Sequence, residues 1–313
     1  MRIGIVVDSA CDLPADFIER ENITILPITV QIGSAVLADV RNEEATMSFL
    51  SGDTGARAYD AESTPYTVQE VHDLFLSKLV LDYDYVFCIT TARSRSTIYD
   101  NAVQASYTIL NDYKPVRSAA GNNTPFALRV IDSQNVFAAV GVLVVEAARM
   151  RASGETPAKI RARLEHLALY TQGYMVPPDL HYMRNRLKKR GDKSVSFLSA
   201  ALGTTLDIKP IVYCNRGETA PVGKVKGLSN ATDKMFDYAS RRVKQGLMTP
   251  TVGISFGGDL KDLHTNPGYL RLRKTCEEHN VEVFESVMGL SGLVNVGKGA
   301  AVVAFAAESE KFS

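Results

Sequence analysis

Short apolar runs, each followed by a polar turn and then by apolar residues at helical spacing, recur along the first half of the chain. The run from Ile3 to Val7 ends in Asp8 and Ser9. The cycle recurs at Tyr85 to Thr90 and at Leu128 to Asp132, and the first of these runs is apolar enough to predict a strand buried on both faces. Such cycles are typical of an α/β fold with a mostly parallel sheet flanked by helices.

Apolar residues at helical spacing predict the helices of this half. They lie from Val71 to Leu79, from about Ile98 to Leu110, and from Val136 to Arg151, the last being rich in alanine and valine. A second strand is predicted from Ile23 to Gln31, and we expect the stretch between it and Val71 to be rich in loops. The pattern as a whole predicts a sheet covered by helices on both sides.

The clearest break in the pattern lies at Ser153 to Pro157, where a helix stop meets a new helix start with proline in its first turn. A boundary here predicts an N-terminal α/β domain of residues 1–153 and a C-terminal α/β domain of residues 154–313. Gly289 to Ala306 is expected to form a turn and then a buried strand. The other elements predicted beyond the boundary are a helix at Ala158 to Leu169 and strands at Thr171 to Val176, Asp207 to Tyr213 and Pro250 to Phe256.

Charge and hydropathy exclude several classes of function. Thirty-five basic residues balance thirty-five acidic ones, so the chain lacks the overall positive field that favours nucleic acids or anionic membranes. No stretch approaches the roughly 18 apolar residues of a membrane span, and the N-terminal apolar run is too short for a signal peptide. We therefore expect a cytoplasmic protein with no integral membrane segment that does not bind nucleic acid.

Cysteine and histidine spacing gives no sign of a metal site. The four cysteines are scattered without a CxxC pair, and the five histidines show no HxxxH or HxH spacing. This pattern fits a reducing compartment, four mostly buried thiols and no disulfide framework. We expect neither a metal nor a cofactor.

Polar clusters follow three of the predicted strands, at residues 8–9, 90–96 and 132–133. In an open α/β sheet such strand exits lie at the carboxyl edge, where ligands bind and helix N-termini favour anions. The clusters therefore predict an anion site, and Arg93 and Arg95 are candidates for a basic clamp within it. The alternative is that the aspartate and serine side chains only cap the helices that follow them.

The pentapeptide Gly253 to Gly257 matches the GxSxG pattern of serine hydrolases, with Ser255 as the candidate nucleophile. His264 and His279 follow it as candidate bases. Two glycines and an aspartate separate the serine from the next predicted helix, so Ser255 is expected within a strand and not at a sharp turn. An acyl- or phosphoryl-transfer enzyme that uses Ser255 or the strand-exit serines remains the alternative to a binding protein.

Two further segments are rich in glycine or in positive charge. Gly289, Gly292, Gly297 and Gly299 match neither the GxGxxG nor the GxxxxGK[ST] pattern of phosphate-binding loops and predict a tight turn. The segment from Arg184 to Lys193 is densely cationic but lacks interleaved aromatic residues. We expect it to form a solvated face or a docking surface for a protein partner.

Five segments, in order along the chain, resemble a known family when they are taken together. They are VVDSACDLP from Val6, ESTPYT from Glu62, SRSTIYDNA from Ser94, VIDSQNV from Val130 and DIKPIV from Asp207. This series is similar to the DegV family of bacterial lipid-binding proteins. The resemblance implies two α/β domains, a fatty acid in an apolar tunnel, and a carboxylate held by hydroxyl groups near the domain interface. It also implies a carrier and not an enzyme, in several members the subunit that presents the fatty acid to a separate ATP-binding kinase subunit.

The resemblance also implies where the carboxylate binds. Ser63 and Thr64 stand at the place of the family's Thr-Ser-Gln-Pro-Ser segment, and Ser96 stands at the serine of its Ser-Gly-Thr-Tyr segment. Asn295 lies in NVGKGA, which is similar to the family's His-x-Gly-Pro-Gly-Ala. These four residues are the expected carboxylate ligands. Supporting roles are expected for Asp8, Ser9, Arg93, Arg95, Thr97, Gly297 and Lys298.

The departures from the family pattern affect the charge of the site. Asn295 replaces the usual histidine, Lys298 replaces the usual proline, and the Gly-Gly-Arg segment is absent around Asp192 to Ser194. An amide offers only neutral hydrogen bonds, so carboxylate affinity or transfer to a kinase is expected to differ unless a neighbouring basic residue restores the charge. Burial of a long acyl chain, at about 0.8 kcal/mol per methylene, is expected to dominate the affinity.

Overall fold

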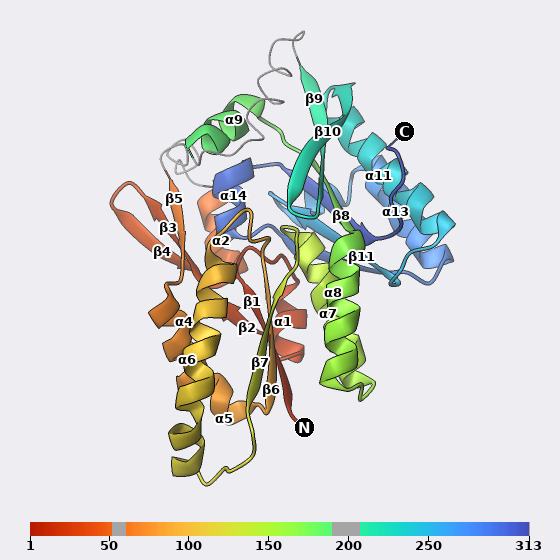
Figure 1. Ribbon diagram of the computed structural model, residues 1–313. Helices are drawn as coiled ribbons and strands as arrows, with labels where there is room; N and C mark the ends of the chain where they lie inside the picture. Colours follow the sequence, from red (N-terminus) through yellow and green to blue (C-terminus); the bar gives the residue numbers. More distant parts are fainter. Residues whose placement is uncertain (52–60, 190–206, 313) are drawn as a thin grey trace.

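The computed structural model describes residues 1–51, 61–189 and 207–312, which form an α/β protein with three β-sheets (Figure 1). The first, here called the parallel sheet, has the strand order β2-β1-β6-β7. The second, the mixed sheet, has the order β10-β9-β8-β13-β11-β12. The third, the small sheet, is antiparallel and has the order β4-β3-β5.

The parallel sheet confirms the strand and helix cycles predicted for the first half. Its strands are β1 (Ile3–Asp8), β2 (Thr24–Leu26), β6 (Tyr85–Thr90) and β7 (Ala127–Asp132). Apolar residues such as Val6, Val71 and Ile98 pack α4 and α6 onto one face of it. The helices of this part are α1 (Ala15–Arg20), α4 (Val68–Leu74), the π-helical turn η2 (Phe75–Leu79), α5 (Val80–Asp82) and α6 (Ile98–Ala119).

The strand predicted from Ile23 to Gln31 is in fact two strands in two different sheets. β2 belongs to the parallel sheet, and after Pro27 the chain enters the small sheet as β3 (Ile28–Ile32). Proline has no N–H to continue a ladder, and the Ile28 N–H is donated to the Ser9 hydroxyl at 3.0 Å. The loop-rich stretch predicted next was also wrong, because it contains β4 (Ala35–Asp39), α2 (Glu43–Ser51) and β5 (Glu62–Pro65).

Helix α7 (Ala138–Ala152) lies between the parallel sheet and the mixed sheet, which confirms the predicted Ala/Val-rich helix. Its residues from Ala138 to Ala148 are all buried. A helix enclosed on every side needs apolar residues all round, so it lacks the single apolar stripe of a surface helix. The exception is Glu146, whose carboxylate forms ion pairs with Arg149 and Arg163.

The predicted break after α7 is a turn with Gly154 at φ +74°, and Thr156 caps α8 (Pro157–Tyr170) beyond it. Helix α8 packs against α7 and against β7 of the parallel sheet, while α7 also contacts three strands of the mixed sheet. Elements from both sides of the turn therefore share one core. The division into domains 1–153 and 154–313 stays a prediction.

The mixed sheet confirms four predicted strands, and α12 (Leu260–Leu263) confirms the helix predicted after Gly257, Gly258 and Asp259. The confirmed strands are β8 (Thr171–Val176), β9 (Ile208–Asn215), β11 (Thr251–Phe256) and β13 (Ala301–Ala306). The other elements are β10 (Glu218–Lys226), β12 (Glu282–Val287), α9 (Leu180–Lys189), α11 (Leu228–Gln245), α13 (Pro267–Glu278) and α14 (Leu290–Val296). Among the described helices, none combines the length and apolar character needed to cross a membrane.

Candidate functional site

The polar residues at the exit of β1 are hydrogen-bonded inside the fold. Asp8 is fully buried, and its carboxylate accepts bonds from the Thr91 N–H at 2.5 Å and the Thr91 hydroxyl at 3.0 Å. Together with the Ser9 bond to Ile28, these contacts join the ends of β1, β6 and β3. The capping alternative is wrong for the exits of β1 and β7, because α1 and α7 begin without a side-chain capping bond. After β6, by contrast, the Ser96 hydroxyl accepts the N–H of Ile98, the first residue of α6.

Burial raises the pKa of Asp8 from 3.8 to about 6, although the bonds from Thr91 and Ala10 favour the ionised form. The folded protein therefore holds this proton more tightly than the unfolded chain does. The contribution to stability is greatest below pH 4 and falls by about 3 kcal/mol in all as the pH rises from there through 6 and above.

We expect this pH dependence to be visible in unfolding. Between pH 4 and 6, the free energy of unfolding of the Asp8→Asn variant should decline less with pH than that of the parent, since asparagine does not titrate. Urea titrations of both proteins at several pH values would measure the difference. Parallel curves would show that Asp8 keeps an ordinary pKa.

The loop after β6 is anchored to the β9–β10 hairpin. The Ser94 hydroxyl donates to the Gly217 carbonyl at 2.8 Å, and Arg95 donates to the Thr219 hydroxyl at 2.9 Å. Arg93 is exposed, lies over the Tyr99 ring and pairs with Asp100, so it faces solvent. The contacts of the two predicted clamp arginines thus differ, since the Arg95 side chain joins the two halves of the chain, whereas the Arg93 side chain contacts the first turn of α6.

Ser96 and Thr97 lie between this anchored loop and α6. The half-buried Ser96 accepts the Ile98 N–H through its hydroxyl at 3.2 Å, whereas Thr97 is exposed. One turn into α6, the Asn101 amide donates to the Tyr66 carbonyl at 2.7 Å. This bond brings the start of α6 to the segment that follows β5.

Ser63 and Thr64 lie on β5 and point to opposite faces of the small sheet. Ser63 pairs with Val30, which is fully buried, whereas Thr64 pairs with Thr29 and is exposed. Successive strand residues alternate between faces, so one of the two hydroxyls is directed inwards and the other outwards. Helix α14 packs on the inner face through Leu290 and other apolar residues.

The glycine-rich segment, predicted as one tight turn, is a helix followed by a turn. Gly292 lies within α14, whereas Gly297 and Gly299 have φ of +93° and +88° and form the turn before β13. The Lys298 ammonium donates to the Leu50 carbonyl at 2.9 Å, at the end of α2. Asn295 lies in the last turn of α14, and its amide donates to the Ser291 carbonyl at 2.7 Å.

Arg186 of α9 is a buried cation that connects Asn295 with the segment before β5. It is 3% exposed and donates to the Ala61 carbonyl and, at 3.4 Å, to the Asn295 side-chain oxygen. The expectation of a solvated basic face was wrong for this residue, although Lys188 and Lys189 are exposed. Residues 190–193 of the basic segment lie outside the described part.

A sequence signal for the position of Arg186 does exist. The arginine follows Tyr182 by four residues and Met183 by three, and both are buried. This spacing puts all three on one side of α9, the side that contacts α14. The apolar periodicity of α9 therefore predicts a buried arginine, although the many charged residues around it predict an exposed segment.

A methionine-rich apolar cluster lies next to these polar residues. It combines Leu50 of α2 and Phe137 with residues of α9, α14 and the mixed sheet, so both halves of the chain contribute. Methionine side chains are flexible and polarisable, which suits a surface that adapts to an apolar ligand. The buried members of this Met-rich cluster are Leu50, Phe137, Met175, Leu180, Met183, Val212, Met288, Leu293, Val296, Ala300 and Val302.

Ser255, the candidate nucleophile, lies inside β11 and is fully buried, as predicted. Its hydroxyl donates to the carboxylate of Asp12 and not to a histidine. The nearest downstream histidine, His264, contacts Glu285 instead. The serine and histidine pair that a hydrolase of this type requires is therefore not formed by these residues.

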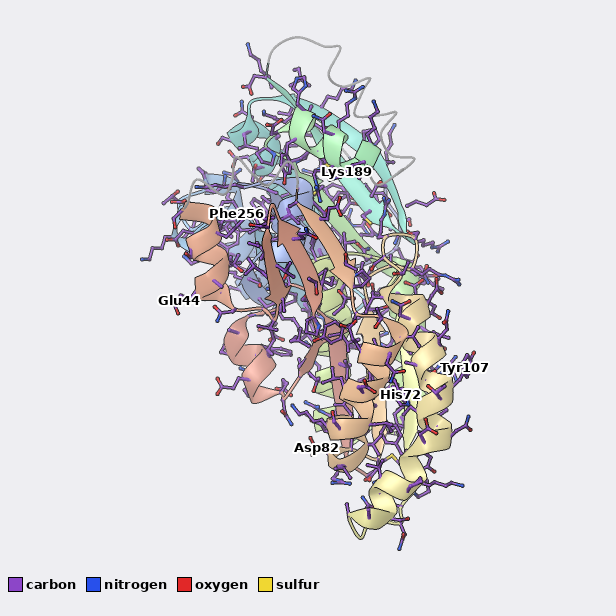
Figure 2. The ribbon with its side chains drawn as sticks, turned by 90° about the vertical axis from the view of Figure 1, so that its left-hand side faces the viewer. Glu44, His72, Asp82, Tyr107, Lys189 and Phe256 are labelled. Carbon is purple, nitrogen blue, oxygen red and sulfur yellow. The ribbon has the colours of Figure 1, made fainter. Side chains whose placement is uncertain are left out.

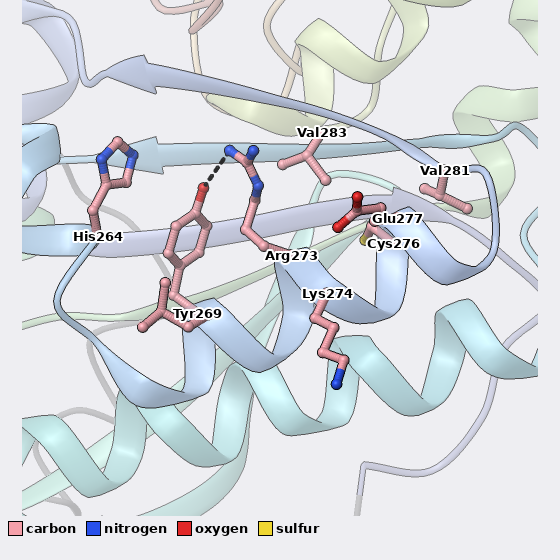
Figure 3. Close-up of a pocket in the computed structure, with 9 residues that line it drawn as sticks. His264, Tyr269, Arg273, Lys274, Cys276, Glu277, Val281 and Val283 are labelled. Carbon is pink, nitrogen blue, oxygen red and sulfur yellow. Dashed lines mark hydrogen bonds between the residues drawn. The ribbon is translucent and has the colours of Figure 1, made fainter.

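A surface pocket lined by His264 and by residues of α13 and β12 lies away from β5, α9 and α14 (Figure 3). Its polar groups are bonded to one another, since Tyr269, Arg273 and His264 all contact Glu285. No group of three metal-ligating side chains occurs in the described ranges, and all four cysteines are free and buried. The buried thiols confirm the prediction made from the cysteine spacing.

Comparison with known proteins identifies the family. Residues 2–308 match the family model described as "Uncharacterised protein, DegV family". A DegV domain-containing protein of Xanthomonas campestris is 58% identical over all 313 residues and covers both chains completely.

Solved structures share the two-domain α/β fold at lower identity. DegV of Bacillus subtilis, described as a fatty acid binding protein, matches with a TM-score of 0.72 and 18% identity over 98% of this chain and 99% of its own. The fatty acid kinase B3 protein of Streptococcus pneumoniae, solved with linoleic acid, matches with a TM-score of 0.72 and 17% identity over 98% and 99%. The fold, the family model and the close relative agree, and this chain belongs to the DegV family.

Proposed function

We propose that this chain binds one long-chain fatty acid between its two halves. The acyl chain would occupy the Met-rich cluster, and the carboxylate would lie beside Ser63, Ser96 and Asn295. The observation that carries the proposal is the buried Arg186, held against Asn295 at the edge of an apolar cluster. Solved relatives that are described as binding fatty acids support the same ligand class.

Arg186 would supply the positive charge that the histidine of the family pattern contributes and that Asn295 lacks. The described contacts of Arg186 include Asn295, whereas Arg93 pairs with Asp100, Arg95 bonds to Thr219, and Lys298 bonds to Leu50. A guanidinium keeps its charge at all physiological pH values, whereas an imidazole does not. Carboxylate binding is therefore expected to vary little between pH 6 and 8.

The geometry of β5 places the hydroxyls of Ser63 and Thr64 on opposite faces of the small sheet, although the two residues are adjacent in sequence. Ser63 faces α14 together with Val30, whereas Thr64 faces solvent. Both were expected to bind the carboxylate, and of the two the position of Ser63 suits a ligand inside the protein. Thr64 serves as a matched control, because it is one residue away in the same strand.

The chain would act as a carrier that presents its ligand to a separate kinase subunit and performs no catalysis itself. The relative from Streptococcus pneumoniae is described as a component of a fatty acid kinase. Lys188 and Lys189 lie on the exposed side of α9, close in sequence to the buried Arg186, and would form part of the docking surface. Rim charges of this kind mainly steer association.

Ligand extraction combined with a pair of alanine variants tests the proposal. We expect an organic extract of the purified protein to release about one fatty acid per chain, measured by mass spectrometry. Ser63→Ala should weaken binding of added fatty acid about tenfold or more, because a hydrogen bond to a charged group contributes about 1.5 to 3 kcal/mol. Thr64→Ala should bind like the parent.

Two outcomes would contradict these statements separately. An extract without fatty acid, together with no binding of added fatty acid by the parent, would refute the carrier function. Binding by the parent with equal losses in Ser63→Ala and Thr64→Ala would leave the ligand class intact and remove Ser63 from the site. Thermal unfolding of the three proteins controls for damage to the fold.

A further inference from the structure

The outer strand of the small sheet, β4, exposes an unpaired apolar edge. In the described sheet it pairs with β3 on one side only. Val36 is 63% exposed, Leu37 is 44% exposed, and Val40 just beyond the strand is 53% exposed. Figure 2 shows the small sheet at the surface, between α2 at Glu44 and α9 at Lys189.

The other outer strands of the described sheets carry features that discourage pairing. β10 has Pro221, a bulge between Pro221 and Gly223, and Lys224 and Lys226. β2 has only three residues, β7 carries Arg129, β12 carries Glu282 and Glu285, and β5 ends in proline. The exposed residues of β4, Ala35 to Ala38, include no charge and no proline, and its one charged residue, Asp39, is buried. An apolar edge without such protection is a site for strand addition.

The hairpin geometry shows which main-chain groups are available. β3 and β4 are joined by the two-residue turn Gly33-Ser34, so the flanking pair Ile32 and Ala35 is hydrogen-bonded. Hydrogen-bonded pairs alternate along an antiparallel ladder, which directs the groups of Leu37 towards β3. The N–H and C=O groups of Val36 and Ala38 are therefore directed outwards.

We propose that β4 pairs with β4 of a second copy of this chain, antiparallel and about a two-fold axis at Leu37. This register puts Val36 of each copy opposite Ala38 of the other, and these are the residues whose main-chain groups are free to bond across the axis. The buried Asp39 falls opposite Ala35, so no like charges meet. The formal net charge of zero leaves no long-range repulsion between copies. The inference does not depend on the fatty-acid proposal.

Charge substitutions on the exposed face test both the surface and the register. Sedimentation of the full-length parent over a range of concentrations should show a dimer of twice the chain mass. Val36→Lys with Ala38→Lys puts like charges opposite each other twice, and the dimer should dissociate at least about tenfold more readily. Val36→Lys with Ala38→Glu creates two opposite-charge pairs in the same register and should keep the dimer.

Tyr107→Lys is the control, because Tyr107 is 67% exposed on α6 and gains a positive charge far from β4. It should leave the dimer unchanged, and all variants should show the circular dichroism spectrum of the folded parent. A parent that stays monomeric at every concentration would overturn the proposal. So would a dimer that survives Val36→Lys with Ala38→Lys, or a monomeric parent whose binding to lipid vesicles is lost in that variant.

Discussion

Replacing Arg41 with methionine is expected to destabilise the folded protein by about 3 to 5 kcal/mol, the usual cost of breaking a buried ion pair from one side. The Arg41 side chain is 6% exposed and contacts Asp12, which is fully buried, at 2.6 Å. Its second nitrogen donates to the Ser286 hydroxyl at 2.8 Å and to the Val287 carbonyl at 2.9 Å. The methionine would fill much of the space but leave the Asp12 carboxylate without its cation.

The matched control is Arg20→Met on α1. Arg20 pairs with Asp16 and Glu21 but is 57% exposed, so its loss should cost less than about 1 kcal/mol. Urea unfolding of parent and variants, followed by circular dichroism, would measure both changes. Equal costs for Arg41→Met and Arg20→Met would show that the buried pair contributes no more than a surface pair.

The same network makes a second variant informative. A methyl group at Gly289 would overlap the Arg41 guanidinium, and the Gly289 N–H donates to the Asp12 carboxylate at 2.9 Å. Gly289→Ala should therefore displace Arg41 and destabilise the protein in a similar way. Because the two changes remove one set of contacts, their costs in the double variant should be less than additive.

Replacing Arg186 with methionine is expected to have the largest effect on the ligand. Arg186 is the buried cation beside Asn295, and a charge-assisted interaction with a carboxylate is worth about 1.5 to 3 kcal/mol. Fatty-acid binding should weaken about 10- to 100-fold, while an uncharged analogue such as the methyl ester should bind parent and variant alike. Titration of both ligands would separate loss of charge from damage to the apolar cluster.

Lys188→Met is the control for this change, since it removes the same charge from the exposed side of the same helix. It should leave the affinity for both ligands unchanged. If Arg186→Met weakens acid and ester equally, Arg186 supports the fold of α9 and does not sense the carboxylate. If Lys188→Met weakens binding of the acid as much as Arg186→Met does, the effect comes from general surface charge.

Local sequence patterns predicted most of the parallel sheet, α7 and the strands in the interior of the mixed sheet. The reason is that an element buried on both sides must be apolar along its whole length, and runs such as YVFCIT and AVVAFA are visible without knowing their neighbours. Apolar runs did not predict the small sheet. Its strand β5 has the sequence ESTP and is half exposed, so its hydrogen bonds to β3 and not its composition make it a strand.

The sequence by itself determined the α/β class, the order of the buried strands along the chain and the family motifs. All three depend on residues that lie close together in the chain. Tertiary structure alone decided the contacts of the site. Ser255 meets Asp12 across 243 positions, and Arg186 meets the Ala61 carbonyl across 125. Local spacing carries no information on such pairs, since the packing of α9, α14 and the sheets brings them together. The same packing buries Arg186, although this residue belongs to a basic segment.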